Sequence, residues 1–189
     1  PNLFNDVDGR YRGRDLEIHT LDTKASTHYT VFSLWDTYRA THPLFTLTQP
    51  KRTNNFIQTF LRQYEEGGDL PVWELAGNET ECMIGYHSVS VIADAAVKGY
   101  EGFDIELAKK GLLATSNFDE YGKLLYANNG FISFGDEPES VSKTLEYAYD
   151  DFCISQFLAK TNLAGSEDLT LKYLKRSFNF VNLYDPSTK

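Results

Sequence analysis

The sequence predicts an all-α fold with minor β structure, because helical signals cover most of the chain. Apolar residues recur at helical spacing in about six segments. Capping residues and glycines stand at the ends of these segments. Alternating β-branched and aromatic stretches are short and lie near the N-terminus. We therefore expect about six helices, roughly paired as hairpins.

The N-terminal part of the chain predicts short strands followed by a helix. Residues 1–30 are rich in Asp, Gly and Arg, which is typical of turns and short strands. The acids before Gly9 look like the start of a calcium loop, but the later ligand positions of an EF-hand are absent. Residues 29–32 alternate as a strand does. Pro43 then fits the first turn of a helix, since apolar positions follow it.

Trp35, Asp36 and Arg39 lie close together between the predicted strand and this helix. An indole offers a flat face to a pyranose ring, and a carboxylate with a guanidinium binds vicinal hydroxyls by charge-assisted hydrogen bonds. The alternative is a structural Asp36–Arg39 pair on one helical face, with Trp35 in the core. Spacing alone favours this structural alternative. The cluster is nevertheless the first candidate site.

The middle of the chain predicts two helices. Residues 53–66 carry one apolar stripe, Thr53 caps them and Gly67 ends them. Residues 73–75 are expected to be a short connector. Residues 82–98 are apolar on almost all sides, which predicts a buried helix.

The C-terminal half predicts three more helices and one long loop. Asp104 caps a helix over residues 104–115. Residues 117–137 are expected to form an aromatic-bearing loop, and loops of this length are often functional. Helices over residues 140–160 and 166–183 follow. Their apolar stripes are Val141, Leu145, Ala148, Phe152, Ser155 and Ala159 in the first, and Leu171, Leu174, Phe178 and Val181 in the second.

Several titratable residues have both a functional and a structural interpretation. Glu79 precedes the buried helix, whose dipole favours the ionised form and hence a hydroxyl acceptor; a helix cap is the alternative. His87 lies within that helix, where a lone histidine is more often a satisfied core residue than a ligand. Glu146 and Asp150 are four residues apart and fit paired carboxylates. The alternative is that they are solvated or paired with neighbours such as Lys143.

Composition excludes several classes of partner. The 189 residues are enough for one domain with a sizeable core, but too few for a large helical toroid. The net charge is −9, and no block rich in Lys or Arg occurs, so nucleic acid and anionic membranes are poor partners. No stretch has the length of a membrane-spanning segment, and no signal peptide is evident. The first residue is Pro1, so we expect a processed or excised piece.

The two cysteines, Cys82 and Cys153, are far apart, each within a predicted apolar helical run. Buried free thiols are the favoured interpretation, and one disulfide is the alternative. A metal site would need more ligands of this kind, so no metal-binding residue is assigned.

Motifs along almost the whole chain, in order, resemble glycoside hydrolase family 92, the α-mannosidases common in gut Bacteroidetes. The chain has no nucleophile elbow, P-loop or dinucleotide-binding motif that would favour another class. The strings that carry the resemblance are DVDGRYRG at residues 6–13, SLWDTYR at 33–39 with HPL at 42–44, GNET at 77–80 with CMIG at 82–85, VIADA at 91–95, VSKTLEYAYDD at 141–151, RS at 176–177 and YDP at 184–186.

The resemblance implies an inverting exo-α-mannosidase that removes terminal α-linked mannose, such as α-1,2-linked mannose, from glycans with the help of calcium. The enzymes of the family join an N-terminal β-sandwich to an (α/α)6 toroid built from helix hairpins. Residues 1–189 would then be a single partial domain, the first half of the toroid, without the sandwich or the second half. The resemblance also implies a bacterial protein that is secreted, periplasmic or on the outer surface.

The chain departs from the family in lacking both catalytic motifs. The family's acid lies in a Glu-Gly-Asn segment and its base in a Gly-Asn-Asp-Asp segment, and neither string occurs here. The acid and base are therefore expected beyond Lys189, and no catalytic residue is assigned. The string at residues 77–80 is not the family's calcium-binding Gly-Asn-Glu-Pro, because Thr80 replaces proline. Calcium is thus expected in the parent enzyme, with none bound by this chain alone.

The resemblance also implies roles in binding a mannose-containing glycan. Asp36 and Arg39 would hold mannose hydroxyls and Trp35 would shape the pocket, with Glu79 and His87 as the next candidates. Alone, the chain should be catalytically inactive, and its uncovered apolar helix faces should lead it either to self-associate or to need its missing half. The alternative function is a non-catalytic helical module that binds carbohydrate or protein through its aromatic loop.

Overall fold

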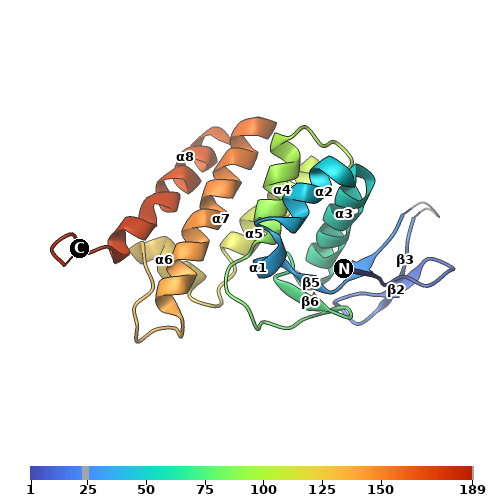
Figure 1. The fold of residues 1–189 in the computed structure, drawn as a ribbon, viewed down its shortest axis with the longest axis horizontal. Coiled ribbons are helices and arrows are strands. Elements are labelled where there is room, and N and C mark those ends of the chain that lie inside the picture. The colour runs from blue at the N-terminus through green and yellow to red at the C-terminus, as the bar shows by residue number, and fades with distance from the viewer. Residues whose placement is uncertain (23–25, 189) are drawn as a thin grey trace.

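The computed structural model describes residues 1–22 and 26–188, and it is predominantly helical with few strands (Figure 1), as predicted. Its helices are α1 (Leu34–Thr37), α2 (Thr41–Thr48), α3 (Pro50–Gly67), α4 (Ser88–Val97), α5 (Ile105–Ser116), α6 (Lys123–Asn129), α7 (Ser140–Thr161), α8 (Glu167–Arg176) and the 3-10 helix η1 (Ser177–Leu183). Its strands are β1 (Asn2–Leu3), β2 (Arg10–Arg12), β3 (Ile18–Thr20), β4 (Tyr29–Thr30), β5 (Phe32–Ser33), β6 (Trp73–Leu75) and β7 (Asn78–Glu79).

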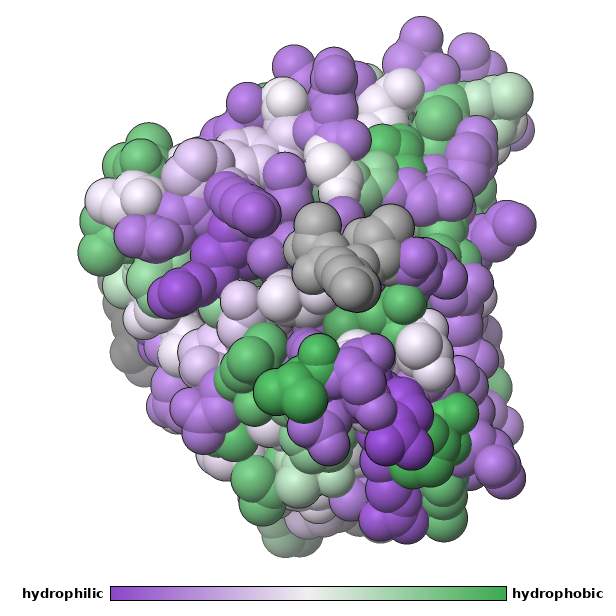
Figure 2. Space-filling view, turned by 90° about the vertical axis from the view of Figure 1, so that its right-hand side faces the viewer, coloured by the Kyte–Doolittle hydropathy of each residue, from purple (hydrophilic) through white to green (hydrophobic). Residues whose placement is uncertain are grey.

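The strands lie at one end of the molecule and the helices α7 and α8 at the other (Figure 1). They form two antiparallel pairs, β1–β4 and β2–β3, and one antiparallel sheet of three strands in the order β5–β6–β7. Hydrophilic side chains cover much of the face at the strand end, with smaller hydrophobic patches among them (Figure 2). Helices α7 and α8 lie side by side and run in opposite directions, so the expected helix hairpin is present here (Figure 1).

The six predicted helices all occur. The N-cap predicted at Thr53 is wrong, because α3 begins at Pro50 and the hydroxyl of Thr53 donates to the carbonyl of Gln49 at 3.3 Å. In α3 the predicted stripe is buried from Phe56 to Leu61, and Gly68 ends the helix with a φ of 88°. In α5 the side chain of Asp104 accepts a hydrogen bond from the N–H of Leu107 at 2.9 Å, as an N-cap does. The helix at Pro43 is α2.

The helix predicted over residues 82–98 begins later, at Ser88. Glu81 and Gly85 have φ values of 57° and 81°, in the left-handed region that breaks a helix. The N–H of Tyr86 donates to Oδ2 of Asp150 at 2.8 Å instead of joining a helical turn. The predicted helix is therefore a loop followed by a shorter helix.

Two more expectations on local structure were wrong. Residues 73–75, expected as a connector, form the central strand β6, which pairs with β5 and β7. Residues 117–137, expected as a loop, contain the short helix α6 between Gly122 and Gly130, both with positive φ. These flanking glycines were a usable signal for its ends. The short helix α1 was also missed.

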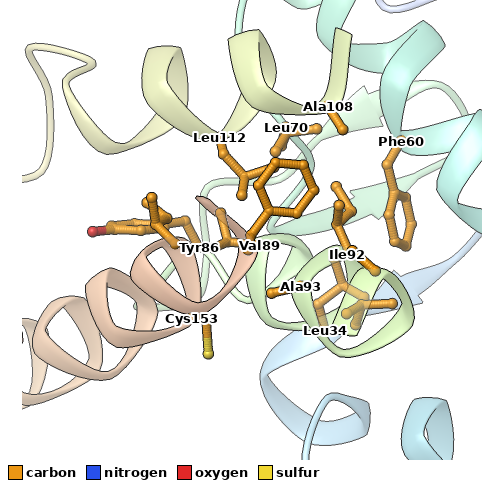
Figure 3. Close-up of a cluster of buried hydrophobic side chains, with 14 of the residues drawn as sticks. Leu34, Phe60, Leu70, Tyr86, Val89, Ile92, Ala93, Ala108, Leu112 and Cys153 are labelled. Atoms are coloured by element: carbon orange, nitrogen blue, oxygen red, sulfur yellow. The ribbon is translucent and has the colours of Figure 1, made fainter. Parts of the chain in front are cut away.

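Helix α4 lies in the hydrophobic core, which confirms the prediction of a buried helix. Val89, Ile92 and Ala93 of α4 pack among side chains from α3, α5 and the loops before them (Figure 3). Leu70, which precedes the sheet, and Leu112 of α5 close the core on the far side (Figure 3). This core holds the start of α4 fixed, and the candidate site is built there.

The apolar stripes of the last two helices are largely exposed. On α7, Leu145 is 46% exposed, and on α8 Leu171 is 56% exposed. The buried face of α8 instead carries Tyr173 and Arg176. The stripes were read correctly as apolar, and the predicted uncovered face on α7 is present. Self-association through it stays a prediction.

Arg176 pairs with Asp151 of α7 inside the molecule. Its Nε donates to Oδ2 of Asp151 at 2.7 Å, and the hydroxyl of Tyr86 donates to Oδ1 at 3.1 Å. The guanidinium lies 4.9 Å from the ring centre of Tyr173 and 5.4 Å from that of Tyr126. Burial raises the pKa of Asp151 to about 7, although Arg176 and Tyr86 favour its ionised form. This buried pair joins α8 to α7.

Candidate functional site

His87 immediately precedes α4 and is fully buried. Its Nδ1 lies 2.9 Å from Oδ1 of Asp150, and its Nε2 lies 3.0 Å from Oε2 of Glu146. The second contact is short enough for an ion pair, but among the described residues no acceptor has hydrogen-bond geometry to Nε2. Both carboxylates come from α7, one turn apart. The structure therefore places the imidazole between the two acids that the sequence suggested as a direct pair.

The two carboxylates decide the charge of His87. Burial lowers the pKa of a histidine, but the charges of Asp150 and Glu146 and the hydrogen bond to Asp150 outweigh it and raise the pKa to about 9. The second oxygen of Asp150 accepts the N–H of Tyr86 at 2.8 Å, so this acid is fully engaged. His87 is thus an imidazolium at neutral pH, and Asp150 is its buried counter-ion.

Glu146 links His87 to Trp35. The indole Nε1–H of Trp35 donates to Oε1 of Glu146 at 3.1 Å. Burial raises the pKa of Glu146, but the nearby charge of His87 and the hydrogen bond from Trp35 act more strongly, so its pKa is lowered overall. An ionised Glu146 therefore fixes the orientation of the indole through its polar edge.

Tyr38 and Arg39 complete the cluster. The Tyr38 ring stacks on His87 with 4.0 Å between centroids and 16° between planes. The guanidinium of Arg39 lies 4.9 Å from the ring centres of both Trp35 and Tyr38, and its Nη2 donates to the carbonyl of Trp35 at 3.0 Å. Arg39 is exposed, whereas Trp35 is half-buried. The result is an aromatic surface with a cation at its edge.

Asp36 does not pair with Arg39. No ion pair joins the two side chains in the part of the chain that the structure describes, and Asp36 accepts a hydrogen bond from the hydroxyl of Ser33 instead. The structural Asp36–Arg39 pair is therefore wrong, because helix α1 is only four residues long and each side chain has another partner. The Asp36 carboxylate is exposed and open to an external donor.

Glu79 lies apart from this cluster, on strand β7. Its two oxygens accept the backbone N–H groups of Val72 and Trp73, each at 2.8 Å. The argument from a helix dipole was wrong, since no helix begins near Glu79 and α4 starts at Ser88. Its main contacts hold the turn before β6 against β7.

The structure therefore unites three of the five predicted site residues, Trp35, Arg39 and His87. Glu146 lies at the centre of these residues, but the sequence predicted it only as one of two paired carboxylates, with Asp150 as the other. The other alternative, a pair with Lys143, is wrong, because Lys143 pairs with Glu137 at 2.7 Å. Sequence spacing placed both acids on one helical face but gave no sign of the histidine between them.

Cys82 and Cys153 are both free. Cys153 is buried as predicted, but Cys82 is exposed because its segment is a loop. No group of three or more His, Cys, Asp or Glu side chains in residues 1–22 and 26–188 is arranged to hold a metal ion. No helix within the same residues is long and apolar enough to cross a membrane.

The family model described as the glycosyl hydrolase family 92 catalytic domain matches residues 1–189. The chain belongs to this family. The resemblance carried by the sequence motifs is thereby confirmed, and it extends to solved structures of the family.

A family GH92 α-mannosidase from Bacteroides thetaiotaomicron is 45% identical, with a TM-score of 0.93 over 99% of this chain. The same α-mannosidase solved in complex with mannoimidazole has the same identity and TM-score. A family GH92 inverting mannosidase from the same species is 32% identical, with a TM-score of 0.86 over 100% of this chain. This chain covers only 25%, 24% and 26% of those three chains, about a quarter of each. A search of the curated proteins found no match.

Proposed function

We propose that this chain supplies one part of an α-mannosidase that hydrolyses terminal α-linked mannose. The observation that carries the proposal is the 45% identity to a family GH92 α-mannosidase that was also solved with mannoimidazole. The described relatives come from Bacteroides, so we further propose a bacterial enzyme that works outside the cytoplasm. In this proposal residues 1–189 are a single partial domain, the first half of an (α/α)6 toroid.

The aromatic surface of Trp35 and Tyr38 is the proposed wall of the mannose pocket. An indole held at its polar edge by Glu146 offers its ring face to the C–H groups of a sugar. Arg39 at the edge of this surface and the exposed Asp36 are the proposed donor and acceptor for sugar hydroxyls. His87 would not contact the sugar. It would position the surface by its ion pair with Glu146 and by stacking against the Tyr38 ring.

The carboxylates of this cluster are poor candidates for the catalytic pair. Inverting hydrolysis needs a general acid with a raised pKa and a base that activates water, roughly 6.5–9.5 Å apart. The pKa of Glu146 is lowered, despite burial, by His87 and Trp35, so it does not hold a proton at neutral pH. Asp150 is buried and occupied on both oxygens. We therefore propose that the acid and base come from outside residues 1–189.

Calcium is proposed for the complete enzyme only, on the family resemblance. The residues that the structure describes contain no cluster that fits such an ion. Within this chain the proposed chemistry is therefore limited to binding and orienting the sugar. A glycan that ends in mannose is the proposed partner, and self-association through the exposed face of α7 is proposed for the isolated chain.

The test is hydrolysis of an aryl α-mannoside by the complete enzyme that contains this chain. Asp36→Asn should lower kcat/KM by about ten- to a hundredfold, the effect of a lost charge-assisted hydrogen bond. Its Tm should stay unchanged, since Asp36 is exposed. Asp168→Asn is the matched control, because Asp168 is an exposed aspartate on α8 and does not belong to this cluster. An equal kcat/KM for both variants, or a fall in Tm that explains the lost activity, would contradict the role of Asp36.

A further inference from the structure

A cavity of about 220 Å³ lies beside the loop that leads from β7 to α4. Its walls come from this loop, from the segment that leads into α6, from the first two turns of α7, from the turn between β2 and β3 and from the end of α3 with the residues after it. The aromatic cluster of Trp35, Tyr38 and Arg39 does not line it. Tyr86 separates the two regions, because its N–H binds Asp150 while its ring lies beside Lys123 at the cavity. The cavity has room for about seven water molecules by volume.

Lys123 is the feature of this cavity that lacks an explanation. Its side chain is only 3% exposed, and its Nζ has no hydrogen-bond or ion-pair partner among the residues that the structure describes. Nζ lies 5.5 Å from the ring centres of Tyr86 and Phe118 and 5.9 Å from that of Tyr121. These rings stabilise the charge of an ammonium, but they do not accept its three N–H bonds as an oxygen would.

The other cations at the cavity already have partners. Arg14 pairs with Asp69 at 2.8 Å, and Lys143 pairs with Glu137 at 2.7 Å. Lys123 is thus the one lysine or arginine of the cavity wall, within the described chain, that keeps its donors free. Most of the Lys123 side chain is removed from solvent and its ammonium faces the cavity, and burial accordingly lowers the pKa of Lys123.

The remaining charges of the wall are acids. Glu79, Glu81, Glu120 and Glu139 line the cavity, and none of them forms an ion pair within the described part of the chain. Burial and the adjacent Glu81 raise the pKa of Tyr121, so its hydroxyl keeps its proton and stays a donor. Glu81, Tyr121 and Glu139 also have positive φ values, a costly conformation for residues other than glycine.

This lining favours one class of ligand. An anion would be repelled by the four glutamates, and a cation would be repelled by the Lys123 ammonium. A hydroxyl group can accept from the ammonium through its oxygen and donate its proton to a carboxylate. Phe118 and Tyr121 offer ring faces to C–H groups. We propose that the cavity binds one ring of a neutral polyhydroxylated ligand, with Nζ of Lys123 donating to a ligand hydroxyl.

The proposal makes no use of hydrolysis, so it can be tested on this chain without an activity assay. Cys82 lines the cavity and is exposed, which makes it a reporter. Cys153 will not interfere, because it is buried and burial raises the pKa of its thiol to about 12. The rate of Cys82 alkylation by N-ethylmaleimide would be followed by mass spectrometry, with D-mannose, myo-inositol or inorganic phosphate added.

We expect both polyols to slow alkylation saturably, by about tenfold at ten times their Kd, because only unoccupied cavities react. Phosphate should have no effect. Lys123→Met should abolish the protection, while Lys110→Met, a change of an exposed lysine, should keep it. Lys123→Arg should restore it in part, since a donor is retained.

Two outcomes would overturn the proposal. One is the absence of polyol protection in a wild-type chain whose circular dichroism and Tm report a folded protein. The other is equal protection in wild type and a folded Lys123→Met variant, which would mean that the polyol acts elsewhere. Protection by phosphate instead of polyols would assign the cavity to anions and would equally overturn it. Mannosidase activity of the complete enzyme would stand or fall separately.

Discussion

Replacing Asp150 with Asn tests whether the buried His87 carries a charge. The pKa of His87 rises from 6.5 to about 9 because Asp150 and Glu146 outweigh the effect of burial. A shift of roughly 2.5 pKa units corresponds to about 3 kcal/mol of differential stabilisation of the imidazolium. Breaking a buried pair typically costs about 3–5 kcal/mol, so Asp150→Asn should lower the free energy of unfolding by about 3 kcal/mol at pH 6.

The pH dependence follows from the direction of the shift. Because the pKa of His87 is higher in the folded chain than in the unfolded chain, its contribution is complete below about pH 6.5. It is lost as the pH rises through about 9, where the folded imidazolium loses its proton. The difference between wild type and Asp150→Asn should therefore be largest near pH 6. It should shrink as the pH rises through 9, because Asp150 then loses the cation beside it and keeps only hydrogen bonds from neutral donors.

Urea unfolding of both proteins across this pH range measures the difference. Asp151 also titrates in this range, because burial raises its pKa to about 7 although Arg176 lowers it. Asp151 is present in both proteins, so its contribution to the difference in unfolding free energy largely cancels. Asp94→Asn is the control, since its pair with Lys98 is on the surface and should be worth less than about 1 kcal/mol. A difference between wild type and Asp150→Asn that stays constant from pH 6 to pH 9.5 would refute the charged His87.

Three further predictions concern other contacts. Glu79→Gln should lower the free energy of unfolding by about 1–3 kcal/mol, because one oxygen that accepts a backbone N–H becomes a donor; an unchanged urea midpoint would contradict this. Arg176→Met should cost about 3–5 kcal/mol by leaving Asp151 buried and unpaired, and adding Asp151→Leu should recover most of it. A double variant no more stable than the single one would argue against the ion pair as the cause. Leu145→Glu should reduce the average mass of the chain in sedimentation, because it charges the exposed face of α7; a wild type that is monomeric at every concentration would rule this out.

The helices could be predicted wherever their signals were local. The Asp104 cap and the stripe that begins at Phe56 are set by residues a few positions apart, so α5 and α3 were found nearly to their ends. The loop before α4 was missed because Glu81 has a positive φ, which is uncommon for a residue other than glycine and which the residue type does not signal. Helix α6 was missed because it is only seven residues long.

The candidate site was predictable only in part. The composition of the string at residues 33–39 indicated Trp35 and Arg39 as site residues. His87 was indicated by the family resemblance. Their link through Glu146 joins residues 111 positions apart, and no local pattern contains such a contact. The apolar stripe of α7 is a second example. Its apolar residues, such as Leu145, predict a surface that favours burial, but they do not indicate which segment covers it.

The long separation between Trp35 and Glu146 has a consequence for synthesis on the ribosome. Trp35 emerges early, but the carboxylate that orients its indole belongs to α7 and leaves the exit tunnel much later. The strand end and α3 can pack before then, whereas the aromatic surface cannot take its final form. During elongation the indole of Trp35 therefore lacks this hydrogen bond, and the proposed sugar-binding wall is completed only when α7 docks against α4.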